Sequence, residues 1–115
     1  VATIFHAPTL EGLLKTLSRA RLFVGSDSGP KHIASALDIP TVTLFGPESI
    51  GEWHCYSSDK HQTLQVPVAC RYMDPSPETF AWCGEAVCPY ASHACMTLLA
   101  PDDVIRVIQN QCHTC

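Results

Sequence analysis

The sequence predicts an α/β fold with a parallel βαβαβ unit, which is half of a doubly wound fold. Three runs of apolar and β-branched residues, 2–5, 22–25 and 41–45, alternate with two helical patterns in the first 46 residues. Strand–helix–strand crossovers are right-handed and make successive strands parallel, so we expect a parallel sheet covered by helices. The 115 residues suit one small domain, and 46% hydrophobic against 16% charged residues suit a packed core.

The first helix is predicted to begin after Thr9. Four leucines then recur at i, i+3, i+4 and i+7 and form one stripe of an amphipathic helix: Leu10, Leu13, Leu14 and Leu17. We expect this stripe to cover the sheet.

The second helix is expected between the strands at 22–25 and 41–45. Residues 26–29 read as a turn, and Pro30 is the residue type favoured at a first helical position. The helix should end before Pro40. Its inward apolar edge is predicted to consist of Ile33, Ala36 and Leu37.

The pattern becomes irregular after Pro47. Residues 63–66 indicate a short fourth strand, whereas residues 67–100 carry four prolines and four cysteines without periodicity and read as loop. Pro101 begins a last helix, with acidic residues at its positive end. The apolar side of that helix is predicted to comprise Val104, Ile105, Val107 and Ile108.

Charge and cysteine usage exclude several classes of protein. Seven Lys and Arg against eleven Asp and Glu give a net charge of −4, which disfavours a nucleic-acid surface. No apolar run approaches the ~20 residues that cross a bilayer, and the start has neither Met nor a basic flank, so we expect the chain to begin inside a longer protein. Six of the seven cysteines lie in the last 46 residues. This uneven distribution favours a reducing compartment over a secreted disulfide scaffold.

A candidate ligand site lies at residues 25–32, between the carboxyl end of a strand and the start of a helix. Ligands bind at this place in open α/β sheets, and free amides at a helix start favour phosphate. We expect a diphosphate held by amides around Ser28, Gly29 and Lys31, with help from the Ser28 hydroxyl and His32. Asp27 would repel phosphate, so it is expected to bond a hydroxyl or to brace the loop.

Three other interpretations of this segment are possible. A P-loop is excluded, because the glycines are one residue too close and Pro30 stands where lysine should follow. A nucleophile elbow centred on Asp27 would need partners from later strands that the chain hardly has. The remaining alternative is that Asp27 and Ser28 only cap the helix and that His32 is a half-buried helical residue.

Residues 22–47, LFVGSDSGPKHIASALDIPTVTLFGP, resemble the signature of glycosyltransferase family 9, the heptosyltransferases of lipopolysaccharide assembly. The similarity continues through residues 10–20 and 95–104. It implies the later part of the carboxyl-terminal, Rossmann-like lobe of a GT-B glycosyltransferase, the lobe that binds ADP-heptose. Asp27, Ser28 and Gly29 match the family's donor loop, and His32 matches its helix histidine.

The resemblance also implies what this chain lacks. The acceptor lobe and its catalytic base have no counterpart here, so no catalytic residue is assigned and the chain alone should be inactive. The acceptor would be lipopolysaccharide core or a protein, in the cytoplasm or at the inner membrane.

We divide the chain into a donor-binding core (1–69), a cysteine-rich loop segment (70–100) and a terminal helix and tail (101–115). An unpaired sheet edge further predicts self-association.

Four cysteines offer a second hypothesis of another class. Separated by 12, 4 and 6 residues, they could hold iron or zinc in a tetrahedral site: Cys70, Cys83, Cys88 and Cys95. Residues 74–83 are similar to the cysteine-rich segment of autotransporter heptosyltransferases, which hold iron with cysteines. The alternatives to a metal site are buried free thiols that pack as small hydrophobic groups and, less favoured, a disulfide. The alternative function for the chain is a metal-dependent interaction module, in which the cysteine segment mediates self-assembly and the loop at 25–32 is vestigial. Trp53 is expected to be a packing residue, although it could approach the donor.

Overall fold

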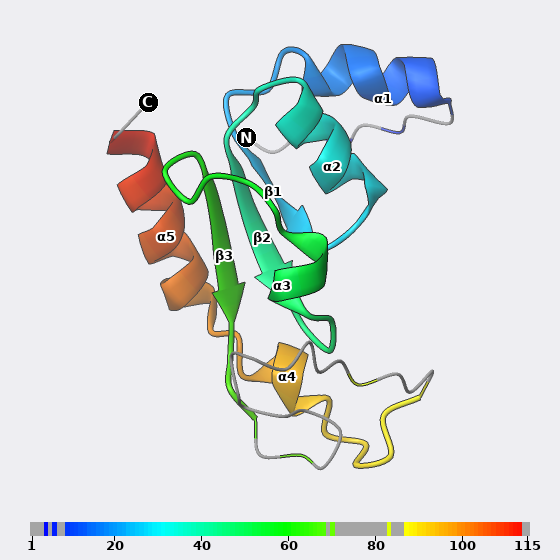
Figure 1. Ribbon diagram of the computed structural model, residues 1–115, viewed down its shortest axis with the longest axis vertical. Coiled ribbons are helices and arrows are strands. Elements are labelled where there is room, and N and C mark those ends of the chain that lie inside the picture. The colour runs from blue at the N-terminus through cyan, green and yellow to red at the C-terminus, as the bar shows by residue number, and fades with distance from the viewer. Residues whose placement is uncertain are drawn as a thin grey trace.

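The computed structural model describes residues 4, 6, 9–68, 70, 83 and 87–113. Its centre is a parallel sheet of three strands in the order β1 (Phe23–Ser26), β2 (Thr41–Phe45) and β3 (His61–Gln65) (Figure 1). The predicted parallel α/β architecture is therefore confirmed. The strand expected over 2–5 lies outside the described residues apart from Ile4.

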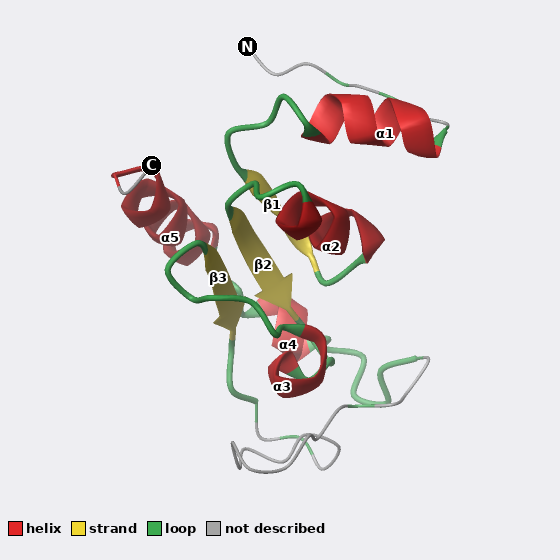
Figure 2. Ribbon diagram, turned by 45° about the horizontal axis from the view of Figure 1, so that its top comes forward, coloured by secondary structure: helices red, strands yellow, loops and turns green. Residues whose placement is uncertain are grey.

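Helices from separate parts of the chain pack around the sheet. Helix α2 (Gly29–Ala36) packs on β1 and β2, α1 (Leu10–Leu17) packs on α2, and α5 (Pro101–His113) lies beside β3 (Figure 2). The long helix α5 is tied to the sheet by Gln111, whose amide donates to the Lys60 carbonyl at 2.9 Å. No helix in the described part of the chain is long and apolar enough to cross a membrane.

Helix α1 begins where the sequence predicts, but only half of its apolar stripe is covered. The Thr9 hydroxyl caps the helix by accepting the Gly12 amide at 3.1 Å. Leu17 is buried, whereas Leu10 is 64% exposed. Among the described residues, α1 packs on α2, and its Leu13 and Leu17 belong to the core that also includes Phe23 of β1.

Helix α2 turns a different face to the sheet from the one predicted. Lys31 and Ala34 are completely buried, whereas Ala36 and Leu37, both expected inside, are exposed. The prediction was correct only for Ile33, which packs against the core of Leu17, Ala34 and Ile39. An apolar pattern cannot identify this face, because one of its two completely buried residues is a lysine.

The irregular region holds two short helices that the sequence does not indicate, α3 (Ile50–Trp53) and α4 (Ala94–Thr97). Strand β3 begins at His61, two residues before the predicted start. In α5 the predicted apolar side is half-buried except for Ile105, which is 49% exposed.

Candidate donor-binding site

The segment that joins β1 to α2 forms the rim of the candidate site. Ser28 is the last residue before α2 and is fully extended, with φ −166°. Its hydroxyl donates to the Ser26 carbonyl at 3.1 Å and does not cap the helix. The interpretation that Ser28 serves only as a helix cap is therefore wrong for its side chain.

Hydrogen bonds within this segment leave fewer backbone amides free than the sequence predicts. The Lys31 amide donates to the Ser28 carbonyl at 3.1 Å inside the first turn, so the expectation that it faces a ligand is wrong. A Cβ built on Gly29 would meet no atom within 4 Å. The position of a side chain at Gly29 is therefore open. In the described part of the chain, the amides of Ser28 and Gly29 have no hydrogen-bond acceptor, and they lie at the positive end of α2.

The four residues predicted for the donor come together at one pocket. A pocket of about 300 Å³ opens beside the start of α2. It is lined by residues from three segments of the chain: Asp27, Ser28, Gly29, His32, Glu48 and Trp53. Trp53, at the end of α3, is 48% exposed and forms part of the wall, so it is not the packing residue that was expected.

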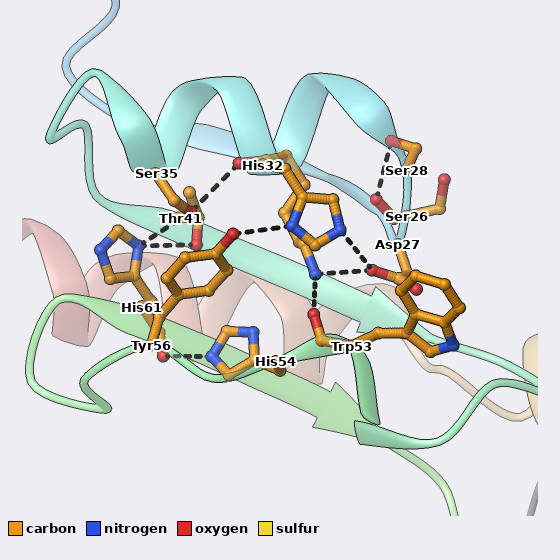
Figure 3. A network of polar contacts seen from close by, with 11 residues as sticks. Ser26, Asp27, Ser28, His32, Ser35, Thr41, Trp53, His54, Tyr56 and His61 are labelled. Atoms are coloured by element: carbon orange, nitrogen blue, oxygen red, sulfur yellow. Dashed lines mark hydrogen bonds and ion pairs between the residues drawn. The ribbon is translucent and has the colours of Figure 1, made fainter. Parts of the chain in front are cut away.

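Asp27 is held by a lysine that sequence reasoning considered only as a backbone amide. The Lys31 ammonium donates to Asp27 Oδ1 at 2.6 Å and to the Trp53 carbonyl at 2.6 Å (Figure 3). The rings of Phe45 and Tyr56 lie with their centroids 5.3 and 5.6 Å from the same nitrogen, within range of cation–π attraction. The i, i+4 spacing of Asp27 and Lys31 was the available signal for this pair.

His32 is fixed by a tyrosine from the irregular segment after α3. Its Nδ1 lies 2.7 Å from the Tyr56 hydroxyl, and its Nε2 lies 3.9 Å from Asp27 Oδ1. Burial raises the pKa of Tyr56, so the phenol is protonated at neutral pH and able to donate to Nδ1. In that arrangement the neutral imidazole carries its proton on Nε2, on the side of Asp27 and the pocket.

Two further histidines connect this segment to the sheet. His61 Nδ1 lies 3.1 Å from the Thr41 hydroxyl, and His54 Nε2 donates to the His61 carbonyl at 3.1 Å (Figure 3). Burial lowers the pKa of both histidines, which favours their neutral forms. Among the described residues, buried His54 Nδ1 and the Thr43 hydroxyl have no hydrogen-bond partner.

The four cysteines predicted to hold a metal are all partly buried and unbridged. Burial, together with the nearby thiols of Cys83 and Cys88, raises the pKa of Cys95. In the described part of the chain, no three His, Cys, Asp or Glu side chains are grouped so that they could hold a metal ion. The metal site therefore stays a prediction.

Comparison with known proteins assigns the family. The profile of glycosyltransferase family 9 (heptosyltransferase) matches residues 5–74, which include the whole pocket. The chain belongs to glycosyltransferase family 9. No solved structure matches it.

Relatives within the family are heptosyltransferases. The chain is 28% identical over 109 residues to lipooligosaccharide heptosyltransferase 2 of Campylobacter jejuni, covering 95% of this chain and 31% of that protein. It is 39% identical over 69 residues to lipopolysaccharide heptosyltransferase 1 of Pseudomonas aeruginosa, covering 59% of this chain and 19% of that protein. The chain thus spans less than a third of the length of these relatives.

Proposed function

We propose that this chain is the donor-binding part of a glycosyltransferase that transfers heptose from ADP-heptose to lipopolysaccharide core or a related acceptor. The observation that carries the proposal is the pocket at the start of α2, where Asp27, Ser28, Gly29 and His32 meet. Family membership supports the reaction class, and the names of the relatives support heptose and a lipopolysaccharide acceptor.

The diphosphate of the donor would lie against the backbone of Ser28 and Gly29. Their amides lie at the positive end of an eight-residue helix, and the absence of a side chain on Gly29 leaves the space beside them open. The Nε2 proton of His32 would add a further donor from inside the same helix. These groups are positioned before a ligand arrives, because Tyr56 holds the imidazole by its other nitrogen.

The same arrangement serves the chemical step. The acceptor hydroxyl attacks the anomeric carbon, the bond from that carbon to the diphosphate oxygen breaks, and negative charge grows on the leaving nucleoside diphosphate. Fixed amides and the helix dipole stabilise that charge without reorganisation. Asp27 lies at the pocket and accepts a hydrogen bond from a hydroxyl of the sugar. The base that takes the proton of the acceptor is assigned to the acceptor lobe, outside these 115 residues, so the chain alone should be inactive.

The names of the relatives also support a proposal for the acceptor. Relatives named for lipopolysaccharide and lipooligosaccharide favour a saccharide acceptor over a protein acceptor. We place the enzyme in the cytoplasm or at the periphery of the inner membrane, where a nucleotide-activated sugar and a membrane-held saccharide acceptor can meet.

The experiment is calorimetric titration of the intact protein that carries this chain with ADP-heptose, repeated on Asp27→Ala. Binding by the wild type and its weakening in the variant would support the proposal. Absence of binding in the intact wild-type protein would overturn it.

We further propose that Cys70, Cys83, Cys88 and Cys95 hold a structural iron or zinc. The support is their spacing in the sequence and the closeness of Cys95 to Cys83 and Cys88. The thiols would have to converge further than they do in the described residues, so binding would bring the four cysteines together around the metal. This segment would then act as a clip for the donor core or as a module for assembly.

A further inference from the structure

We propose that Lys31 is a positioning residue that joins the two walls of the pocket and aims the Asp27 carboxylate at the sugar of the donor. The inference rests on the proposed function and adds to it a residue that does not itself line the pocket. Lys31 lies beneath the rim, on the inward face of α2, and its side chain is completely buried.

Lys31 connects segments that are far apart in the sequence. One of its hydrogen bonds, 2.6 Å long, reaches Asp27 in the segment after β1, and the other, also 2.6 Å, reaches the carbonyl of Trp53 at the end of α3. Asp27 and Trp53 both line the pocket. One ammonium group thus fixes the position of one wall relative to the other.

The chemistry of the buried ammonium makes this link rigid. A buried charge is costly unless it is paired and hydrogen-bonded, so Lys31 holds its two oxygen partners in place for as long as it remains inside. The aromatic rings of Phe45 and Tyr56 occupy further sides of the nitrogen. Lys31 therefore has few alternative positions, and Asp27 cannot rotate away without leaving the charge unpaired.

The pairing also decides which oxygen of Asp27 is available. Within the described residues, the hydrogen bond and the ion pairs of this carboxylate reach Oδ1, which faces Lys31 and lies 3.9 Å from His32 Nε2. Oδ2 is left to accept a hydrogen bond from a ligand in the pocket. A sugar hydroxyl supplies the proton that such an oxygen needs, whereas a phosphate at neutral pH would be repelled by it.

This role differs from a purely structural one in a measurable way. If Lys31 only stabilises the fold, its removal should weaken the binding of ADP-heptose and of ADP by the same factor. If it aims Asp27 at the sugar, its removal should weaken ADP-heptose selectively, because ADP has no sugar in that position and is held by the amides of Ser28 and Gly29.

The experiment measures the dissociation constants of ADP-heptose and ADP for the intact protein and its Lys31→Met variant, which keeps the length of the side chain and removes the charge. We expect ADP-heptose to bind about ten- to a hundred-fold more weakly, the range for loss of a hydrogen bond to a charged group, and ADP to change by less than about three-fold. The matched control is Lys15→Met, which removes an exposed ion pair of the same spacing, with Glu11 at 2.7 Å. It should change neither constant.

A second variant keeps the inference testable should Lys31→Met fail to fold. Asp27→Asn retains an oxygen for Lys31 but replaces the free oxygen with an amide, so it should show the same selective loss. In a folded Lys31→Met background it should add little further loss. A wild-type preference for ADP-heptose over ADP that persists in either variant would overturn the role of Lys31. If the wild type bound neither ligand, the proposed function would be overturned instead.

Discussion

Replacing Gly29 with alanine should affect ligand binding and protein stability in different ways. The added methyl group would meet no protein atom within 4 Å, so the free protein accommodates it. Gly29 is the first residue of α2, where alanine is also the better helix former. We therefore expect Gly29→Ala to leave the free energy of unfolding unchanged or to raise it by up to about 1 kcal/mol.

Gly29→Ala should weaken the binding of the donor, although it does not destabilise the fold. The methyl group would enter the open space beside the amides of Ser28 and Gly29, where the diphosphate is proposed to lie. Displacing the phosphate from one such amide removes a charge-assisted hydrogen bond worth about 1.5–3 kcal/mol, or roughly ten- to a hundred-fold in the dissociation constant. The same substitution thus leaves the protein at least as stable and weakens the binding of its ligand.

Two assays on the intact protein check this prediction. Thermal unfolding measures stability, and calorimetric titration with ADP-heptose and ADP measures affinity. Because the diphosphate is common to both ligands, both should bind more weakly, unlike in Lys31→Met. The control is Gly12→Ala, which raises helix propensity in α1, away from the pocket. Unchanged affinity in a folded Gly29→Ala variant would refute the reasoning.

Three further predictions concern the rest of the molecule. A Cβ at Gly46 would lie 2.5 Å from Met96 Sδ, but Met96 is 41% exposed and its flexible side chain can move aside, so Gly46→Ala should lower the free energy of unfolding in urea by less than about 1 kcal/mol; a loss of more than about 3 kcal/mol would contradict this. Burial lowers the pKa of His61 and His54 below the ordinary 6.5, so in acid the unfolded chain binds more protons than the folded chain, and the free energy of unfolding should fall as the pH drops below 6.5. His61→Gln should reduce this dependence on pH. A free energy of unfolding that stays constant between about pH 8 and pH 5 would disprove it. Elemental analysis of protein purified without added metal should find near-stoichiometric iron or zinc in the wild type and little in Cys95→Ser. A substoichiometric metal content in the wild type would contradict the metal hypothesis.

The sheet could be predicted from the sequence because its strands and crossovers have local signatures. Strand β2 occupies the predicted residues, and β1 and α2 begin within one residue of theirs. The pocket at the start of α2 could be located for the same reason, since its rim is the turn between a strand and a helix. Proline at that turn restricts the backbone and glycine permits a tight bend, and both residue types are read directly from the sequence.

The residues that sequence reasoning missed depend on contacts between distant segments. Lys31 is buried because Asp27, a carbonyl of α3 and two aromatic rings surround it, and only the first of these partners is near it in the sequence. Tyr56 lies in a segment without periodicity, so no pattern indicates that it holds His32 at 2.7 Å. The positions of such side chains are set by tertiary packing and not by local propensity.

The most direct test of the account is a crystal structure of the intact protein with ADP-heptose bound. We expect the diphosphate within hydrogen-bond distance of the backbone amides of Ser28 and Gly29, with a sugar hydroxyl on the free oxygen of Asp27. A diphosphate bound elsewhere in the protein, with these two amides facing only solvent, would contradict it.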